Sequence, residues 1–288
     1  MRLGSVWRAG VLVATVGTLG LSIAAPVSAH PGAALPSYQG APPPNWPVFR
    51  QCPVTATLAP PGLGKVKICI KGVASEGTIN IGSLDTTFHG PGIIQGGTGA
   101  IGAPPSWADA LDGRSFTAPQ QLMAKPVLAA LGNPPGVKPP AQSQVFVLAQ
   151  QAGPIRASFT TGASGLVNTT TVPLSFQLLN PLLGSHCFVG TVRHPVVLNL
   201  TTGTSETLTG NLGTVALAHK AILYTTDTEV VDGTFAAPGA TGCGPGGLWD
   251  SALDTNNGLP SASGNNEAIL YGSFDLAQAS DVKKHLGE

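Results

Sequence analysis

Short stretches in which apolar and polar residues alternate recur along this chain and constrain its fold more than any other feature. In residues 65–73, Val66, Ile68 and Ile70 alternate with lysines and Cys69. A period of two places successive side chains on opposite faces of a strand. Cys69 falls on the polar face, so we expect its partner to staple a neighbouring segment over that surface. Further strand-like segments are 78–81, 145–149, 155–160, 171–178, 196–200, 215–218, 222–231 and 268–276.

The composition favours strands joined by turns. Charged residues make up only 10% of the chain, too few for the polar faces of long amphipathic helices. The 38 glycines and 26 prolines together are 64 of 288 residues, just below the share typical of disordered chains. Segments 90–106 and 133–140 are predicted loops, 118–131 has room for one short helix, and Pro173 predicts an edge or a bulge in its strand. We therefore expect an all-β fold: a single antiparallel sandwich- or barrel-like domain with long Gly/Pro-rich loops, two disulfides and at most one short helix.

The N-terminus has the pattern of a secretory signal peptide. Arg2 and Arg8 precede an apolar run that ends in small residues, which predicts cleavage after Ala29. Residues 30–50 form a Pro-rich extended lead-in, which Trp46 and Phe49 are expected to dock onto a single β domain at 51–288. No later segment is long and apolar enough to span a bilayer. We expect a secreted, extracellular protein, either free or loosely associated with the cell envelope.

The cysteines fit an exported chain. Their even number predicts two disulfides with three possible connectivities. We favour Cys52–Cys69 and Cys187–Cys243, since each closes within its own half of the chain. The larger loop is expected to contribute about 4 kcal/mol of stability. A zinc site is disfavoured because the sequence has no C-x-x-C spacing.

The sequence offers weak candidates for metal binding. Asp254, Asn256 and Gly258 resemble the start of a calcium loop, but position 12 is Asn265 rather than glutamate. An Asx turn followed by a loop is the preferred interpretation. The histidines His89, His186, His194 and His219 lack the spacing of a metal motif.

Catalytic and glycosylation signals are also weak. No G-x-S-x-G motif for a serine hydrolase occurs, and no catalytic residue is assigned. Paired carboxylates of a glycosidase stay open, although Asp85, Asp109, Asp112, Asp227, Glu229 and Asp232 are expected near turns or at exposed strand positions. Asn168 and Asn199 begin formal glycosylation sequons.

Several segments resemble a group of secreted actinobacterial proteins. The motifs are NPLLGSHCFVG at 180–190, HPVVLNLTTGT at 194–204, FAAPGATGCG at 235–244 and GLPSASGNN at 258–266. No activity of that group is carried over. The resemblance implies an exported setting and the pairing of Cys187 with Cys243; a long insert around 90–140 departs from it.

These features lead to two functional hypotheses. Cleavage of the signal peptide leaves 12 basic and 14 acidic residues, which gives no electrostatic footprint for nucleic acid. We expect no cofactor. The leading hypothesis is a non-catalytic extracellular or envelope-associated module that binds a cell-envelope component or a small apolar ligand. The alternative is a secreted hydrolase of cell-wall polysaccharide or ester substrates.

Overall fold

The computed structural model describes residues 45–138, 143–162, 165–218 and 222–287. All of them belong to one compact unit, residues 40–288. The predicted signal peptide, most of the lead-in and His219 lie outside the described residues.

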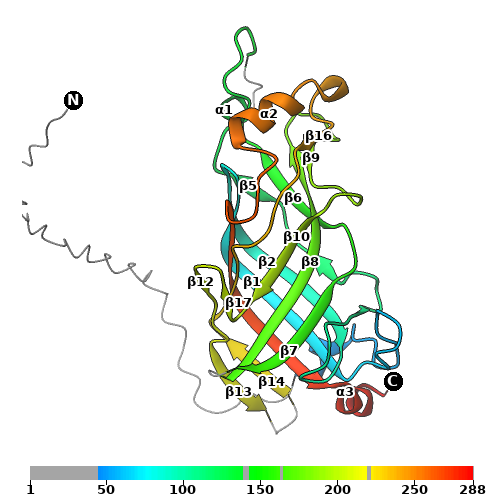
Figure 1. Cartoon of the computed structure of the whole chain (residues 1–288). Coiled ribbons are helices and arrows are strands. Elements are labelled where there is room, and N and C mark those ends of the chain that lie inside the picture. The colour runs from blue at the N-terminus through cyan, green and yellow to red at the C-terminus, as the bar shows by residue number, and fades with distance from the viewer. Residues whose placement is uncertain (1–44, 139–142, 163–164, 219–221, 288) are drawn as a thin grey trace, which may run out of the picture. The chain divides into compact units, whose positions relative to one another are not determined.

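The main sheet is antiparallel and closes on itself (Figure 1). Its strands follow the circuit β1-β2-β5-β6-β8-β10-β15-β17, and β17 pairs with β1 to complete it. The closed circuit corresponds to the barrel-like form of the expected all-β fold. The strands of the circuit are β1 (Ile68–Ile81), β2 (Leu84–Thr98), β5 (Gln121–Met123), β6 (Phe146–Gln151), β8 (Gly165–Leu179), β10 (Val196–Thr201), β15 (Thr228–Asp232) and β17 (Asn266–Gln278).

Shorter strands extend this circuit at its margins. Several short strands join the main sheet: β3 and β4 pair with β2, β7 pairs with β8, β9 pairs with β8 and β16, and β13 pairs with β14. Strands β11 and β12 form a separate two-stranded sheet. These strands are β3 (Ala108–Asp109), β4 (Phe116–Thr117), β7 (Arg156–Gly162), β9 (Phe188–Val189), β11 (Thr204–Ser205), β12 (Leu208–Thr209), β13 (Thr214–Ala218), β14 (Ile222–Thr226) and β16 (Ala240–Thr241).

The strands match the alternating segments, with three differences in extent. Segment 78–81 continues β1 after a register shift between Ala74 and Glu76 rather than forming a strand of its own. The loop expected at 90–106 is wrong for residues 90–98, because β2 runs to Thr98 and pairs with β1 up to that residue, whereas residues 99–106 belong to no named strand or helix. Segment 222–231 is divided into β14 and β15 at Asp227, whose φ of 57° interrupts the extended backbone.

Pro173 shows how a central strand accommodates a residue without an amide donor. β8 pairs with β6 up to Leu174 and with β7 from Thr171, so Pro173 lies where one neighbour ends and the next begins. Its carbonyl still accepts the Ala152 amide at 2.8 Å. The edge form of the prediction is wrong, because β10 pairs with the other side of Pro173; instead, Pro173 faces the break between β6 and β7.

The helices outnumber the prediction of at most one. Within the described residues there are three short α-helices, α1 (Val127–Ala130), α2 (Asp250–Asn257) and α3 (Ala279–Leu286), and two 3-10 turns, η1 (Trp46–Phe49) and η2 (Pro245–Gly247). Only α1 lies in the segment expected to be helical. α3 has Asp281 in its first turn, basic residues in its last and left-handed Gly287 as its cap, a pattern that favours a helix.

Apolar side chains form two clusters. The larger fills the interior of the closed sheet. The smaller lies on the outer side of β1 and β17, beneath η1 and α3, and includes Phe49 and Cys69. Trp46 packs against this cluster and stacks on His285 with ring centroids 4.2 Å apart. The expected docking of Trp46 and Phe49 is thus confirmed.

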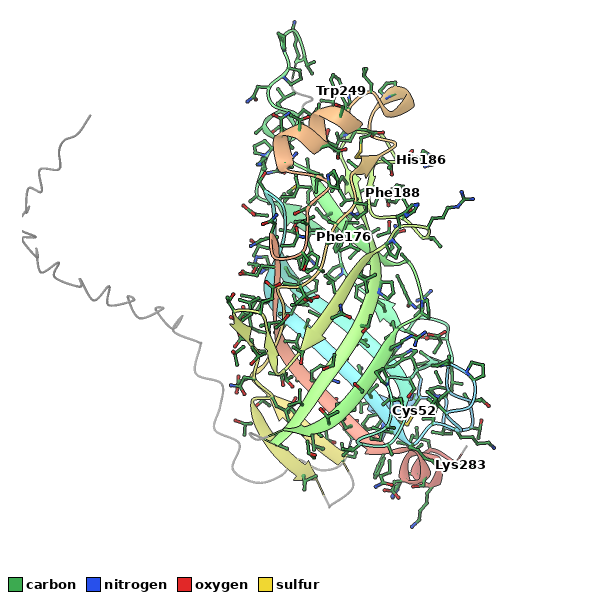
Figure 2. All side chains as sticks on the ribbon, viewed as in Figure 1. Cys52, Phe176, His186, Phe188, Trp249 and Lys283 are labelled. Atoms are coloured by element: carbon green, nitrogen blue, oxygen red, sulfur yellow. A yellow bond between two sulfur atoms is a disulfide. The ribbon has the colours of Figure 1, made fainter. Side chains whose placement is uncertain are left out.

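Both favoured disulfides are present. Cys52–Cys69 fastens the segment after η1 over the outer face of β1, as the position of Cys69 predicted. Cys187–Cys243 lies near the opposite end of the sheet, where Figure 2 shows His186, Phe188 and Trp249 together. None of the helices in the described part of the chain has the length and apolar character of a membrane span.

Candidate ligand cavity

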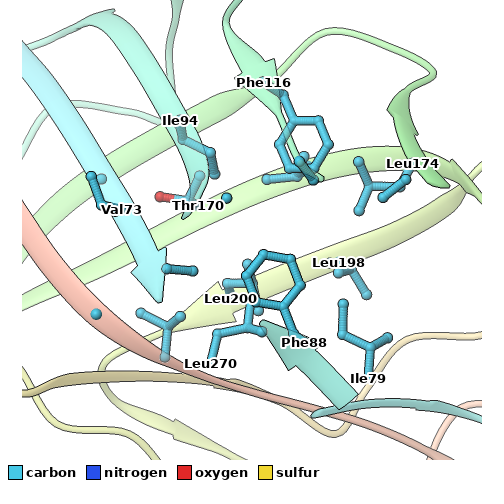
Figure 3. Close-up of a pocket in the computed structure, with 18 of the residues that line it drawn as sticks. Val73, Ile79, Phe88, Ile94, Phe116, Thr170, Leu174, Leu198, Leu200 and Leu270 are labelled. Atoms are coloured by element: carbon cyan, nitrogen blue, oxygen red, sulfur yellow. The ribbon is translucent and has the colours of Figure 1, made fainter. Parts of the chain in front are cut away.

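The interior of the closed sheet contains a cavity of about 80 Å³. Inward-facing side chains of the circuit strands and of β4 form its wall (Figure 3). Leucine, isoleucine, valine and phenylalanine dominate this wall. Figure 3 labels Val73, Ile79, Phe88, Ile94, Phe116, Thr170, Leu174, Leu198, Leu200 and Leu270.

Several small residues line this space. Gly72, Ala74, Gly92, Ala149 and Gly272 line the cavity and contribute at most a methyl group each. A glycine inside a strand weakens the strand unless another group packs over it. The ring of Phe274 lies over one of them and that of Phe88 over another. A Cβ atom added at Gly72 would lie 2.6 Å from Cε1 of Phe274, and one at Gly92 would lie 2.6 Å from Cζ of Phe88.

One side of the cavity is less enclosed than the others. The lining residues Ile94, Phe116, Ala118, Pro119 and Ala149 are only half-buried. They lie where β2 faces β6; the three-residue β5 pairs with both of these strands, and the two-residue β4 pairs with β2. The cavity is therefore least enclosed at this gap in the ladder.

A smaller void of about 10 Å³ adjoins the cavity. Four residues, Ile79, Thr86, Val147 and Phe176, line both spaces and separate them. Thr86 lies on β2 between the pairing partners Ile79 and Met123. The interior is therefore constricted at Thr86.

The polar groups of the lining differ in how fully they are bonded. Gln121 is saturated: its Oε1 accepts the His89 amide at 2.7 Å, and its Nε2 donates to the carbonyls of His89 and Pro119. Thr228 donates to the Leu212 carbonyl at 2.9 Å and lies 2.7 Å from the Thr225 hydroxyl.

Asn168 and Thr170 retain bonding capacity. Both are buried on β8, and the Thr170 hydroxyl donates to Oδ1 of Asn168 at 3.0 Å. The Asn168 Nδ2 contacts the Ser158 carbonyl at 3.5 Å, the outer limit for a hydrogen bond.

Among the described residues, the cavity lining includes no carboxylate, imidazole, ammonium, guanidinium or thiol. The titratable residue among the described lining residues is Tyr271. Its side chain points to the outer face of β17 and is 41% exposed. Burial and, secondarily, the carboxylate of Glu229 raise the pKa of Tyr271 above its usual value. The interior is thus built for apolar contact and neutral hydrogen bonding.

The calcium candidate occupies a different part of the fold. Asp254 and Asn256 lie on α2, and Gly258 is the left-handed cap at its end, so the expected Asx turn with a loop is replaced by a helix. Oδ1 of Asp254 accepts the Ala240 amide at 2.7 Å. Within the described residues, no group of three or more His, Cys, Asp or Glu side chains is placed to hold a metal. Calcium binding by Asp254, Asn256 and Gly258 stays a prediction.

α2 explains the glycine-rich FAAPGATGCG segment. The Asp250 carboxylate accepts the amides of Gly242 and Cys243, and Asp254 approaches Gly239 so closely that an added Cβ would lie 2.7 Å from it. The two aspartates thus fasten the segment beside the Cys187–Cys243 disulfide. This motif has a structural role.

Other sequence candidates are dispersed. His89, His186 and His194 are exposed, and each disulfide uses its two cysteines. Of the two sequons, Asn199 is exposed, whereas Asn168 is fully buried and inaccessible to a glycosyltransferase in the folded state.

Asp232 lies at the end of β15, beside a bend at Gly233, but it is fully buried rather than exposed. Its carboxylate accepts the amides of Asn199 and Thr234 and the Thr234 hydroxyl. These bonds give Asp232 a structural role between β10 and β15.

Sequence reasoning missed the cavity because its residues come from separate strands and form no motif. The signal that was present is the occurrence of Gly72, Gly92 and Gly272 within strands or at strand-like positions. Comparison with family models, with curated proteins and with solved structures gave no match. The resemblance to secreted actinobacterial proteins therefore stays an expectation.

Proposed function

We propose that this chain is an exported, non-catalytic binding protein that holds a small apolar ligand inside the closed sheet. The observation that carries the proposal is the apolar cavity whose inward side chains bear no ionisable group. An enclosed apolar pocket with a few polar groups is the usual form of a small-molecule site.

The size of the cavity sets the scale of the ligand. About 80 Å³ limits the ligand to the size of a single aromatic ring or a short alkyl chain at most and excludes a large lipid. Burial of such a ligand, less the cost of association, corresponds to a dissociation constant on the order of 1 mM.

The hydrolase alternative has less support. Hydrolysis needs a nucleophile beside a base, or two carboxylates facing a bound substrate. The cavity lining supplies neither pair, since its side chains are aliphatic, aromatic, hydroxyl or amide.

The export part of the proposal rests on two features. The N-terminal sequence has the pattern of a signal peptide, and two disulfides are suited to an oxidising compartment. Envelope association belongs to the same proposal and is tested by retention of the protein on cell-wall fractions.

Adjacent threonines provide a matched test of ligand binding. Thr86 lines the cavity, whereas Thr87 is exposed on the opposite face of β2. Toluene is titrated into the protein and followed by ligand-detected NMR. We expect saturable binding, its loss in Thr86→Phe and its retention in Thr87→Phe. Equal binding by both variants, or none by the unmodified protein, would refute the proposal.

A further inference from the structure

The cavity combines an apolar wall with one neutral polar corner. From this we infer that the ligand is an uncharged small amphiphile, an apolar body bearing a single hydroxyl or similar neutral head, and that Asn168 and Thr170 bind the head. The inference rests on the proposed function and specifies its ligand class.

Asn168 and Thr170 present a hydrogen-bond donor and an acceptor side by side. The Thr170 hydroxyl gives its proton to Asn168 Oδ1 at 3.0 Å, so the lone pairs of Thr170 Oγ1 can accept a bond. The Asn168 amide carries two protons, and its contact with the Ser158 carbonyl at 3.5 Å engages one of them weakly. A hydroxyl that both donates and accepts matches this corner.

The other polar side chains of the lining match such a head less well. Gln121 and Thr228 are engaged with backbone carbonyls and amides. Thr86 supplies a lone hydroxyl at the constriction, among the apolar Ile79, Val147 and Phe176 that share both spaces. Among the described lining residues, the Asn168–Thr170 corner is therefore the best place for a neutral head.

The same lining disfavours an ionic head. A carboxylate or an ammonium group buried without a counter-charge loses hydration that neutral hydrogen bonds do not restore. None of the lining side chains that the structure describes supplies that counter-charge. Among ligands with the same alkyl chain, those with an ionic head should therefore bind more weakly than those with a neutral head.

Four probes distinguish this inference from the proposed function. Toluene, 1-hexanol, hexanoate and hexylammonium are each titrated at pH 7 into the unmodified, disulfide-bonded protein. We expect toluene and hexanol to bind, and hexanol to bind at least about tenfold more tightly than either ion. If toluene binds but hexanol binds less than tenfold more tightly than either ion, the inference is overturned and the proposed function stands. Failure of both toluene and hexanol overturns both.

Two isosteric substitutions on one strand locate the head. Thr170→Val should weaken hexanol binding about fivefold and leave toluene binding unchanged, because only the hydroxyl is removed. Thr171→Val, on the outer face of β8, should change neither, and Thr170→Ser should retain hexanol binding. Equal loss of hexanol and toluene in Thr170→Val, or unchanged hexanol binding, overturns the assignment. If Thr170→Val does not fold, the four-probe comparison on the unmodified protein decides.

Discussion

The carboxylate of Asp232 accepts a hydrogen bond from the backbone amide of Asn199 at 2.5 Å. This bond spans β10 and β15, the join of the closed circuit with the fewest paired residues, since only Thr201 and Val231 are in register there. The same carboxylate accepts the Thr234 amide and hydroxyl, both at 2.7 Å. A side chain thus supplements the ladder bonds at the join between β10 and β15.

Replacing this carboxylate should weaken the closed sheet. In Asp232→Asn, an amide that donates protons faces backbone amides that also donate, so buried groups lose their partners. We expect a decrease of about 3 kcal/mol in the free energy of unfolding, measured by urea denaturation. The exposed Asp227 on the same segment is the control, since Asp227→Asn keeps a residue tolerant of its left-handed φ. Similar stability of both variants would show that Asp232 does not hold this join.

Asp275 should make the protein less stable as the pH rises. It lies on β17 between Lys71 of β1 and Tyr224 of β14. Burial raises the pKa of Asp275 to about 6, although Lys71 opposes the shift. An unfolded aspartate titrates near pH 3.9, so the folded state binds the proton more tightly. Its stabilising contribution is present below about pH 4 and is lost as the pH rises through 6.

The comparison with Asp275→Asn isolates this effect from other titrating groups. Thermal unfolding is measured for both proteins between pH 4 and 7.5. We expect the melting temperature of the unmodified protein to fall relative to that of the variant across this window. Parallel profiles would mean that Asp275 titrates alike in the folded and unfolded states.

The two disulfides should contribute unequally. They span 56 residues in Cys187–Cys243 and 17 in Cys52–Cys69. Chain entropy predicts losses of about 4 and about 3 kcal/mol when each is replaced by a pair of alanines. Denaturation of the two double variants measures the difference. A greater loss from Cys52→Ala/Cys69→Ala would show that packing of the outer cluster outweighs loop length.

The glycine beneath Phe274 should tolerate no side chain. In Gly72→Ala the new methyl group would lie 2.6 Å from the ring, and we expect a loss of about 1–3 kcal/mol. Adding Phe274→Leu removes the ring and should recover part of that loss in a double-mutant cycle. Additive effects of the two substitutions would show that the ring does not limit the space at Gly72.

Much of the fold follows from local sequence patterns, because alternation reports which face of a strand is buried. It does not report which strands pair. β1 joins residues 68–81 to both 84–98 and 266–278, and nothing in residues 68–81 predicts the second partner. The extent of β2 was missed because its glycines indicate a loop until the ring of Phe88 is placed over Gly92.

The cavity was less predictable than the fold. Its lining brings together β2, β8 and β17, whose spacing in the sequence carries no motif. Asn168 illustrates the difficulty: its sequence context indicates an exposed glycosylation site, yet its neighbours in the closed sheet bury it completely. Tertiary placement therefore decided its role.

The position of a bound ligand tests the central claim most directly. Intermolecular NOEs are recorded between toluene and protein labelled at leucine and valine methyl groups. Binding inside the closed sheet predicts NOEs to Leu200 and Leu270, which line the cavity, and none to the exposed Val215 and Leu217. NOEs confined to Val215 and Leu217, or the absence of any to Leu200 and Leu270 at saturating toluene, would contradict the account.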